Sequence, residues 1–113
     1  MSDSIFTKIL KKEINSEIIY EDKYVFGIND INPIAPIHIL IIPKEQILTL
    51  NDINENNDFI MGKIFLAAKE ISKKLNVSEN GYRLIFNCNE DAGQTVFHIH
   101  CHLLAGKKLN WNV

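Results

Sequence analysis

Three of the four histidines of this chain, His98, His100 and His102, lie within five residues. Ile99 and Cys101 separate them, and two leucines follow. Alternation of this kind is typical of a β-strand, where successive side chains point to opposite faces. We therefore expect the three imidazoles on one face of a strand and the apolar residues between them in a core.

Such a cluster has two candidate chemistries. Imidazoles two residues apart on a strand can share a zinc ion, with His38 or His102 as a further ligand. Alternatively, a neutral imidazole attacks phosphorus while its neighbour handles the proton of the leaving group. Histidine suits both roles because its unperturbed pKa is about 6.5. Groups that can all become cationic are unfavourable side by side, which argues against a purely structural role.

The loop before the histidines favours the reaction at phosphorus. Residues 89–95 read Asn-Glu-Asp-Ala-Gly-Gln-Thr, a polar stretch with one glycine. Gly93 lets the backbone approach a ligand closely. Backbone N–H groups around Gly93, Gln94 and Thr95, with the Thr95 hydroxyl, can donate to phosphate oxygens. The sequence therefore predicts an anion site that needs no arginine.

Composition limits the partners of this site. The chain has 113 residues, of which 46% are apolar and 23% charged, as in one folded globular domain. Its net charge of −2 offers no field for nucleic acid or an anionic membrane. Arg83 is the only arginine. Without a long apolar run, a secretory pattern or enough cysteines for a disulfide framework, we expect a reduced, cytoplasmic protein.

Periodicity and turn residues predict the elements that position these side chains. A short helix is expected over Ile5–Lys12, capped by Asp3 or Ser4, and a long helix from Asn57. The apolar stripe of the long helix is Ile60, Ile64, Ala67, Ala68, Ile71 and Leu75. The predicted strands are Glu17–Tyr20, Tyr24–Ile28, His38–Ile42, Tyr82–Asn87 and Phe97–Leu104. This order predicts an α+β fold with a mainly antiparallel five-stranded sheet. A helix that crosses between two strands also allows one pair of strands to be parallel.

Beyond these patterns, the chain resembles the histidine triad (HIT) family. Residues 97–104 resemble its signature His-φ-His-φ-His-φ-φ, where φ is apolar. Residues 29–38 resemble its Asp-Ile-x-Pro-x-Ala-Pro-x-His segment, residues 87–95 its Asn-x-Gly-x-x-Gly-Gln-Ser/Thr loop, and residues 4–9 its N-terminal helix. The ending at 104–111, with its glycine and tryptophan, resembles the Hint branch. The resemblance implies one HIT domain over residues 1–113.

The resemblance also implies an activity, that of a purine nucleoside phosphoramidase. His100 would attack the α-phosphorus of an adenosine or guanosine 5′-phosphoramidate, and water would then release the nucleoside monophosphate from the histidine. His102 would contact the phosphate. His98 and His38 would fix the tautomer and orientation of the nucleophile. No cofactor and no metal are implied.

The same resemblance assigns the binding residues. Asp30 would accept from the ribose hydroxyls, and Asn87, Gly93, Gln94 and Thr95 would hold the phosphate and the leaving group. The purine would occupy an apolar slot formed by Ile5, Phe6, Ile9, Ile28 and Ile31. The implied partner is a second copy of the chain, in a homodimer whose sheets join across the interface, whose long helices pack there, and in which Trp111 approaches the other active site.

Several positions depart from the family pattern. Many relatives hold zinc with a Cys-x-x-Cys pair and two histidines, but Ser4 and Thr7 occupy the cysteine positions here. Hydroxyls are poor zinc ligands, so that site is not expected. Gln46 stands where a histidine is common, and Glu90 replaces a glycine of the loop, which would stiffen the loop or alter the leaving-group preference.

Other functions remain open on the sequence alone. The superfamily also contains dinucleotide hydrolases and nucleotidyl transferases, against which the ending of this chain argues. A purine- or metal-binding regulatory module with little turnover would use the same residues. Zinc content and the release of AMP from a phosphoramidate separate these alternatives.

Overall fold

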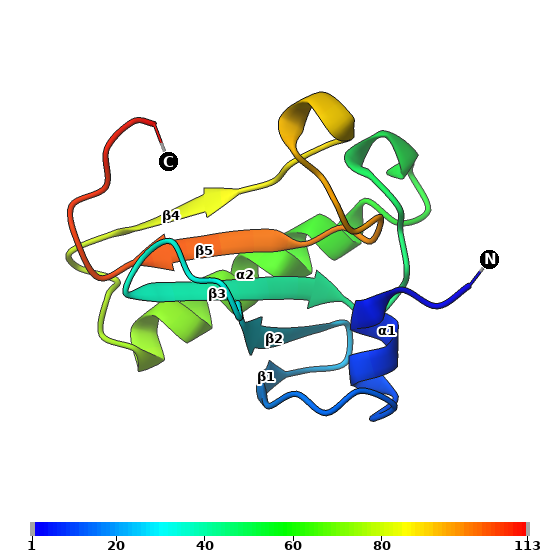
Figure 1. The fold of residues 1–113 in the computed structure, drawn as a ribbon, viewed down its shortest axis with the longest axis horizontal. Coiled ribbons are helices and arrows are strands. Elements are labelled where there is room, and N and C mark those ends of the chain that lie inside the picture. Colours follow the sequence, from blue (N-terminus) through cyan, green and yellow to red (C-terminus); the bar gives the residue numbers. More distant parts are fainter. Residues whose placement is uncertain (1, 113) are drawn as a thin grey trace.

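A five-stranded antiparallel sheet organises the computed structural model, which describes residues 2–112. Its strands are β1 (Ile18–Glu21), β2 (Val25–Asn29), β3 (Ile37–Pro43), β4 (Tyr82–Ile85) and β5 (Cys101–Ala105). Their order is β1-β2-β3-β5-β4, so β3 is central and β4 forms one edge (Figure 1). All four pairings are antiparallel, so the parallel pair left open by the sequence does not occur.

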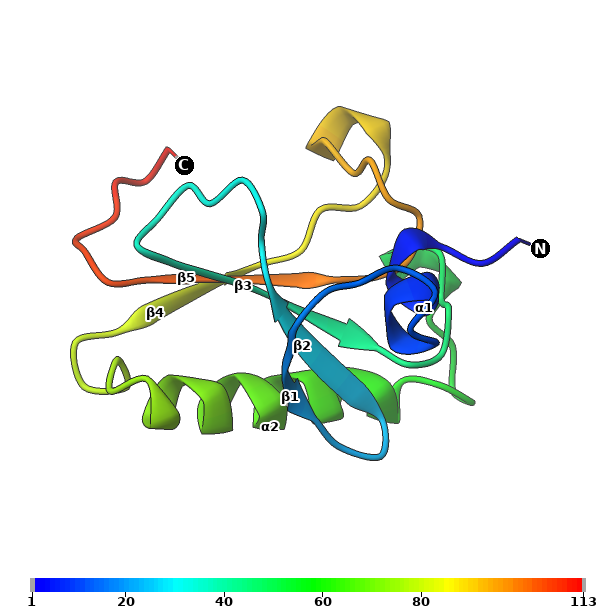
Figure 2. The ribbon, with the colours of Figure 1, turned by 60° about the horizontal axis from the view of Figure 1, so that its bottom comes forward.

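Two α-helices pack against this sheet. The short helix α1 (Ile5–Leu10) lies beside the end of β3 and is capped by Ser4, whose hydroxyl accepts from the Thr7 N–H at 3.0 Å. The long helix α2 (Phe59–Lys74) runs along one face of the sheet, and the loops before β3 and before β5 rise on the other face (Figure 2). Within residues 2–112 no helix is long and apolar enough to cross a membrane.

The two faces of the sheet have separate apolar clusters. The predicted stripe of α2 is buried against β3 and β5, except for Leu75, which follows the last helical residue and is 41% exposed. Ile99, Cys101 and Leu103 join this cluster, as their alternation predicted. On the opposite face, α1 joins β2 and β3 through Phe6, Ile9, Phe26, Ile28, Leu40 and Ile42.

The elements differ from the sequence prediction mainly at their ends. The short helix stops at Leu10, because Lys12 has a positive φ of 65°. The long helix starts two residues later than expected, since residues 55–58 form a turn. Strands β1 and β2 of the first hairpin each lie one residue later in the chain than predicted, and β4 ends at Ile85 instead of Asn87. Cys88 is half-buried, whereas Cys101 is buried, and both thiols are free.

The largest difference concerns the segment predicted as the last strand. Regular pairing begins at Cys101, not at Phe97, and residues 96–98 form a bend. The Ile99 N–H donates to the carbonyl of Ile47 at 2.8 Å instead of joining a strand ladder. His98 and His100 therefore precede β5, and the strand ladder begins only at Cys101, although the alternation of faces already holds at Ile99.

Candidate active site

The four histidines form a row on the sheet face opposite α2. His38 comes from β3, His102 from β5, and His98 and His100 from the segment before β5. The ring centroids of His38 and His102 are 5.2 Å apart, and those of His102 and His100 are 5.1 Å apart. Phe6 touches both remaining rings edge-on, at 5.0 Å from His100 and 5.7 Å from His98. The cluster predicted from spacing is thus present, with His38 as its fourth member.

His100 has one ring nitrogen engaged and the other available. Its Nδ1 lies 2.8 Å from the carbonyl oxygen of His98, which can only accept, so Nδ1 carries the proton. Burial lowers the pKa of His100, which favours the neutral ring. In that neutral ring Nε2 bears the lone pair. This is the form of imidazole that attacks an electrophile.

His38 and His102 are hydrogen-bonded to each other. The Ile34 N–H donates to Nδ1 of His38 at 3.1 Å, so neutral His38 carries its proton on Nε2. That nitrogen lies 2.9 Å from Nδ1 of His102, which accepts. Burial first, then His100 and His38, lowers the pKa of His102 to about 4. Neutral His102 therefore has its proton on Nε2, where it can donate to a ligand.

Asp30 lies beside this pair. Its Oδ2 is 3.3 Å from Nε2 of His38, and its Oδ1 accepts from the Asn32 N–H at 2.8 Å, which closes a turn. Asp30, His38 and His102 offer three ligand atoms within 4.8 Å of one another, a spacing that suits a metal ion. A metal bound there would displace the proton between the two imidazoles. The site as it stands is satisfied by hydrogen bonds.

His98 is fully buried and is held at both ring nitrogens. Nε2 lies 2.7 Å from the carbonyl oxygen of Pro43, so it carries a proton. Nδ1 lies 2.6 Å from Oγ of Ser4. Burial lowers the pKa of His98, which favours the neutral ring and makes the Ser4 hydroxyl the donor of this contact. With both nitrogens occupied, His98 can orient its neighbours but offers no free nitrogen to a substrate.

The loop before β5 uses several of its own donors. Gly93 has a φ of 86°, and its N–H donates to Glu90, while the Gln94 N–H donates to Asn89. The buried Gln94 amide accepts from the Asn89 N–H at 2.8 Å and donates to the carbonyl of Leu48 at 2.9 Å. Gln94 thus shapes the loop. Of the three N–H groups considered for phosphate, that of Thr95, with its hydroxyl, has no hydrogen bond to another described residue.

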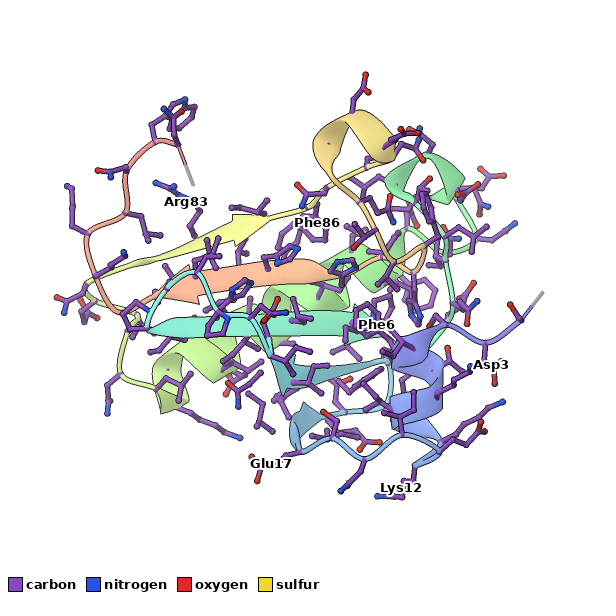
Figure 3. All side chains as sticks on the ribbon, in the orientation of Figure 1. Asp3, Phe6, Lys12, Glu17, Arg83 and Phe86 are labelled. Carbon is purple, nitrogen blue, oxygen red and sulfur yellow. The ribbon has the colours of Figure 1, made fainter. Side chains whose placement is uncertain are left out.

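The residues expected around the purine fall into two sets. Phe6, Ile9 and Ile28 are buried together in the cluster under α1. Ile5 is 46% exposed and Ile31 is 90% exposed, so neither belongs to that core. Figure 3 shows Phe6 pointing from α1 toward the sheet, which places the buried set next to the histidines. Asn87, half-buried after β4, has no side-chain hydrogen bond within the described chain.

One polar group was missed by sequence reasoning. Ser4, Thr7 and Gln46, noted only as departures from a pattern, lie together with His98 at the start of α1. Two hydroxyls, one amide and one imidazole are a poor donor set for zinc, and their polar atoms are already hydrogen-bonded. The proximity of Ser4 and Thr7 could have been inferred, because both match the Cys-x-x-Cys positions of one site in many relatives. The direction of each hydrogen bond could not.

Comparison with known proteins identifies relatives along nearly the whole chain. The family model for the HIT domain matches residues 11–109. A purine nucleoside phosphoramidase of Escherichia coli K12 is 45% identical over 107 residues, which are 95% of this chain and 90% of that protein. An uncharacterized HIT-like protein of Buchnera aphidicola subsp. Baizongia pistaciae is 53% identical over 110 residues, covering 97% and 98% of the two chains. A solved HIT family hydrolase from Clostridium thermocellum superposes with a TM-score of 0.95 at 49% identity, covering 100% of this chain and 98% of its own.

Proposed function

This chain belongs to the HIT family, and on that premise we propose that it hydrolyses purine nucleoside phosphoramidates at the α-phosphorus. The observation that carries the proposal is the proton arrangement of His100, whose Nδ1–H is held by the His98 carbonyl while Nε2 is left with a lone pair. The Escherichia coli relative is a purine nucleoside phosphoramidase. Because burial lowers the pKa of His100, its ring is unprotonated near neutral pH, as an attacking imidazole must be.

The proposed reaction has two steps. In the first, Nε2 of His100 bonds to the α-phosphorus as the phosphorus–nitrogen bond breaks. The Nε2–H of neutral His102 donates to a phosphate oxygen, and the leaving nitrogen takes its proton from a water molecule beside it. In the second step, water attacks phosphorus and the bond to His100 breaks, and the proton of the attacking water neutralises the hydroxide left by the first step. The products are the amine and the nucleoside monophosphate.

We assign the other substrate contacts to groups that are not already used in hydrogen bonds within the protein or that lie beside the histidines. Phosphate oxygens are bound by the N–H and hydroxyl of Thr95, with the amide of Asn87 nearby in the chain. Asp30, which lies 3.3 Å from His38, accepts from the ribose hydroxyls. The buried set under α1 supports the purine, and the exposed Ile5 and Ile31 cover it from the solvent side.

The test compares the release of AMP from an adenosine 5′-phosphoramidate by the protein and by its His100→Ala variant. We expect His100→Ala to lose at least about 10³-fold in kcat, because the nucleophile is gone. His102→Ala should lose less, since a hydrogen-bond donor is replaced more easily by water. His100→Ala should still bind AMP, because base and ribose contacts lie elsewhere.

Four outcomes would contradict these assignments. Equal turnover by the protein and His100→Ala would exclude His100 as the nucleophile. Loss of AMP binding in a variant with an unchanged circular dichroism spectrum would contradict the division between reacting and binding residues. Stoichiometric zinc without turnover would favour a regulatory metal-binding module, and cleavage of dinucleotides alone would favour that branch of the superfamily. Ser78→Ala, on an exposed turn, is the control substitution.

A further inference from the structure

A connected cluster of half-buried polar side chains lies next to the buried His98, where the start of α1 meets the end of β3 (Figure 1). Gln46 Oε1 accepts from the Ser4 N–H at 2.8 Å and from the Thr7 hydroxyl at 2.8 Å. Gln46 Nε2 donates to the carbonyl of Ser2 at 2.9 Å. Ser4 Oγ lies 2.6 Å from Nδ1 of His98. None of these side chains has a part in the reaction steps described above.

The donors and acceptors of this cluster define the direction of each hydrogen bond. The Thr7 hydroxyl has one proton, which goes to the amide oxygen of Gln46. The Ser4 hydroxyl accepts from the Thr7 N–H at 3.0 Å, so its own proton is free to be donated. Nδ1 of His98, at 2.6 Å, is nearer than Oγ1 of Thr7, at 3.3 Å. Ser4 therefore donates to His98, whose opposite nitrogen donates to the Pro43 carbonyl at 2.7 Å.

We propose that Ser4, supported by Thr7 and Gln46, is a positioning residue for the nucleophile of this enzyme. Together with the Pro43 carbonyl, its hydroxyl holds His98 in the tautomer protonated at Nε2 and fixes the place of that ring. The backbone carbonyl of His98 in turn holds the Nδ1–H of His100 at 2.8 Å. The kinetic part of this inference rests on the proposed function, whereas its structural part does not.

The cluster has this role without a metal. Zinc prefers thiolate, imidazole and carboxylate ligands, and the positions that hold them in many relatives carry two hydroxyls and an amide here. A hydroxyl proton directed at an imidazole gives what a metal bond at that nitrogen would give, namely a single tautomer and a defined ring position. Addition of zinc should therefore leave the His98 ring unchanged, and stoichiometric zinc bound through His98 would overturn the proposal.

The decisive measurement is nitrogen NMR of the His98 and His100 rings at pH 7 in the protein and in three Ser4 variants. Ser4→Thr keeps the hydroxyl and should keep both tautomers. Ser4→Asp keeps a capping side chain but offers only an acceptor, so a proton should move onto Nδ1 and make His98 cationic. Ser4→Ala removes the donor, so Nδ1 of His98 should show the signal of a nitrogen without a hydrogen bond, while Nε2 stays protonated against the Pro43 carbonyl. Unchanged His98 signals in Ser4→Ala would overturn the proposal whether or not the protein is an enzyme.

Kinetics then separate positioning from a general loss of stability. In Ser4→Ala and Ser4→Asp we expect kcat to fall about tenfold or more while AMP affinity stays within about twofold, with Ser4→Thr near the parent value. Parent kcat in a folded Ser4→Asp variant with cationic His98 would overturn the kinetic part. If Ser4→Ala does not fold, Thr7→Val, which removes only the hydroxyl bound to Gln46, should give a smaller loss of kcat in the same direction. An inactive parent protein would refute the proposed function and leave the NMR result as the test of the cluster.

Discussion

The four imidazoles of this molecule share a pKa below the usual histidine value, and burial is the first cause in each case. Each ring is neutral at neutral pH, and for every ring except that of His100 the tautomer is set by a group distant in the chain. Ser4 and Pro43 set that of His98, and the Ile34 N–H sets that of His38. The types and spacing of the histidines predicted the cluster. They could not predict the tautomers, because these depend on partners that only folding brings near.

These depressed pKa values predict that stability is lost on mild acidification. An unfolded histidine titrates near 6.5, whereas folded His102 titrates at about 4, so between these values the unfolded chain binds more protons. Stability is therefore complete above pH 6.5 and declines as the pH falls toward 4. We expect the free energy of unfolding to drop by on the order of 2 kcal/mol from His102 alone between pH 7 and 4.5. Urea unfolding of the protein and of His102→Asn measures this, and equal slopes in both would contradict it.

Among the elements, the segment before β5 shows that a periodic pattern does not determine the hydrogen-bond partners of a segment. Its alternation of histidine and apolar residues is that of a strand, but the Ile99 N–H pairs with the Ile47 carbonyl and the His98 ring with the Pro43 carbonyl. These long-range contacts outweigh the local preference. By contrast, the stripe of α2 was predicted correctly up to Ile71, because a helix that packs on a sheet is governed by its own periodicity.

Helix α2 also contains a polar group that should weaken it. Ser72 is fully buried, and its hydroxyl has no hydrogen-bond partner among the residues the structure describes. A buried hydroxyl without a partner is unfavourable, and alanine is the better helix former. Ser72→Ala should therefore raise the free energy of unfolding by about 1 kcal/mol. Urea denaturation checks this against Ser78→Ala, an exposed serine beyond the helix that should change little. A loss of stability in Ser72→Ala would show that the hydroxyl is satisfied in solution.

On the scale of the whole molecule, two surface features are suited to binding a second copy of the chain. Strand β4 pairs with β5 on one side and has no neighbouring strand on its other side among the described residues. On α2, Phe59, Phe65 and Leu66 are each about half exposed beside the open Gly62. The sequence predicted this packing only through a resemblance, because a buried stripe says nothing about the opposite side of a helix. A chain of this length buries only about two-thirds of its unfolded surface, so association adds stability.

The C-terminal segment would link such a dimer to the active site. Arg83 reaches from β4 toward this segment, and its Nη1 lies 2.6 Å from the carbonyl of Asn110 (Figure 3). Trp111, the next residue, is 91% exposed. An exposed apolar side chain beside an edge strand is suited to contact a partner subunit, which is the role that the family resemblance implies for Trp111.

We therefore predict that Leu66→Asp converts a dimer into monomers and lowers turnover. A carboxylate in the middle of an apolar interface loses hydration without gaining a partner, which is strongly unfavourable. Light scattering coupled to size-exclusion chromatography should report half the parent mass, and kcat should fall because each site loses the other subunit's Trp111. Ile14→Asp, an exposed apolar residue outside α2 and β4, is the matched control and should remain a dimer. A parent protein that elutes as a monomer would contradict the proposed interface, whereas a fully active Leu66→Asp monomer would contradict only the contribution of Trp111.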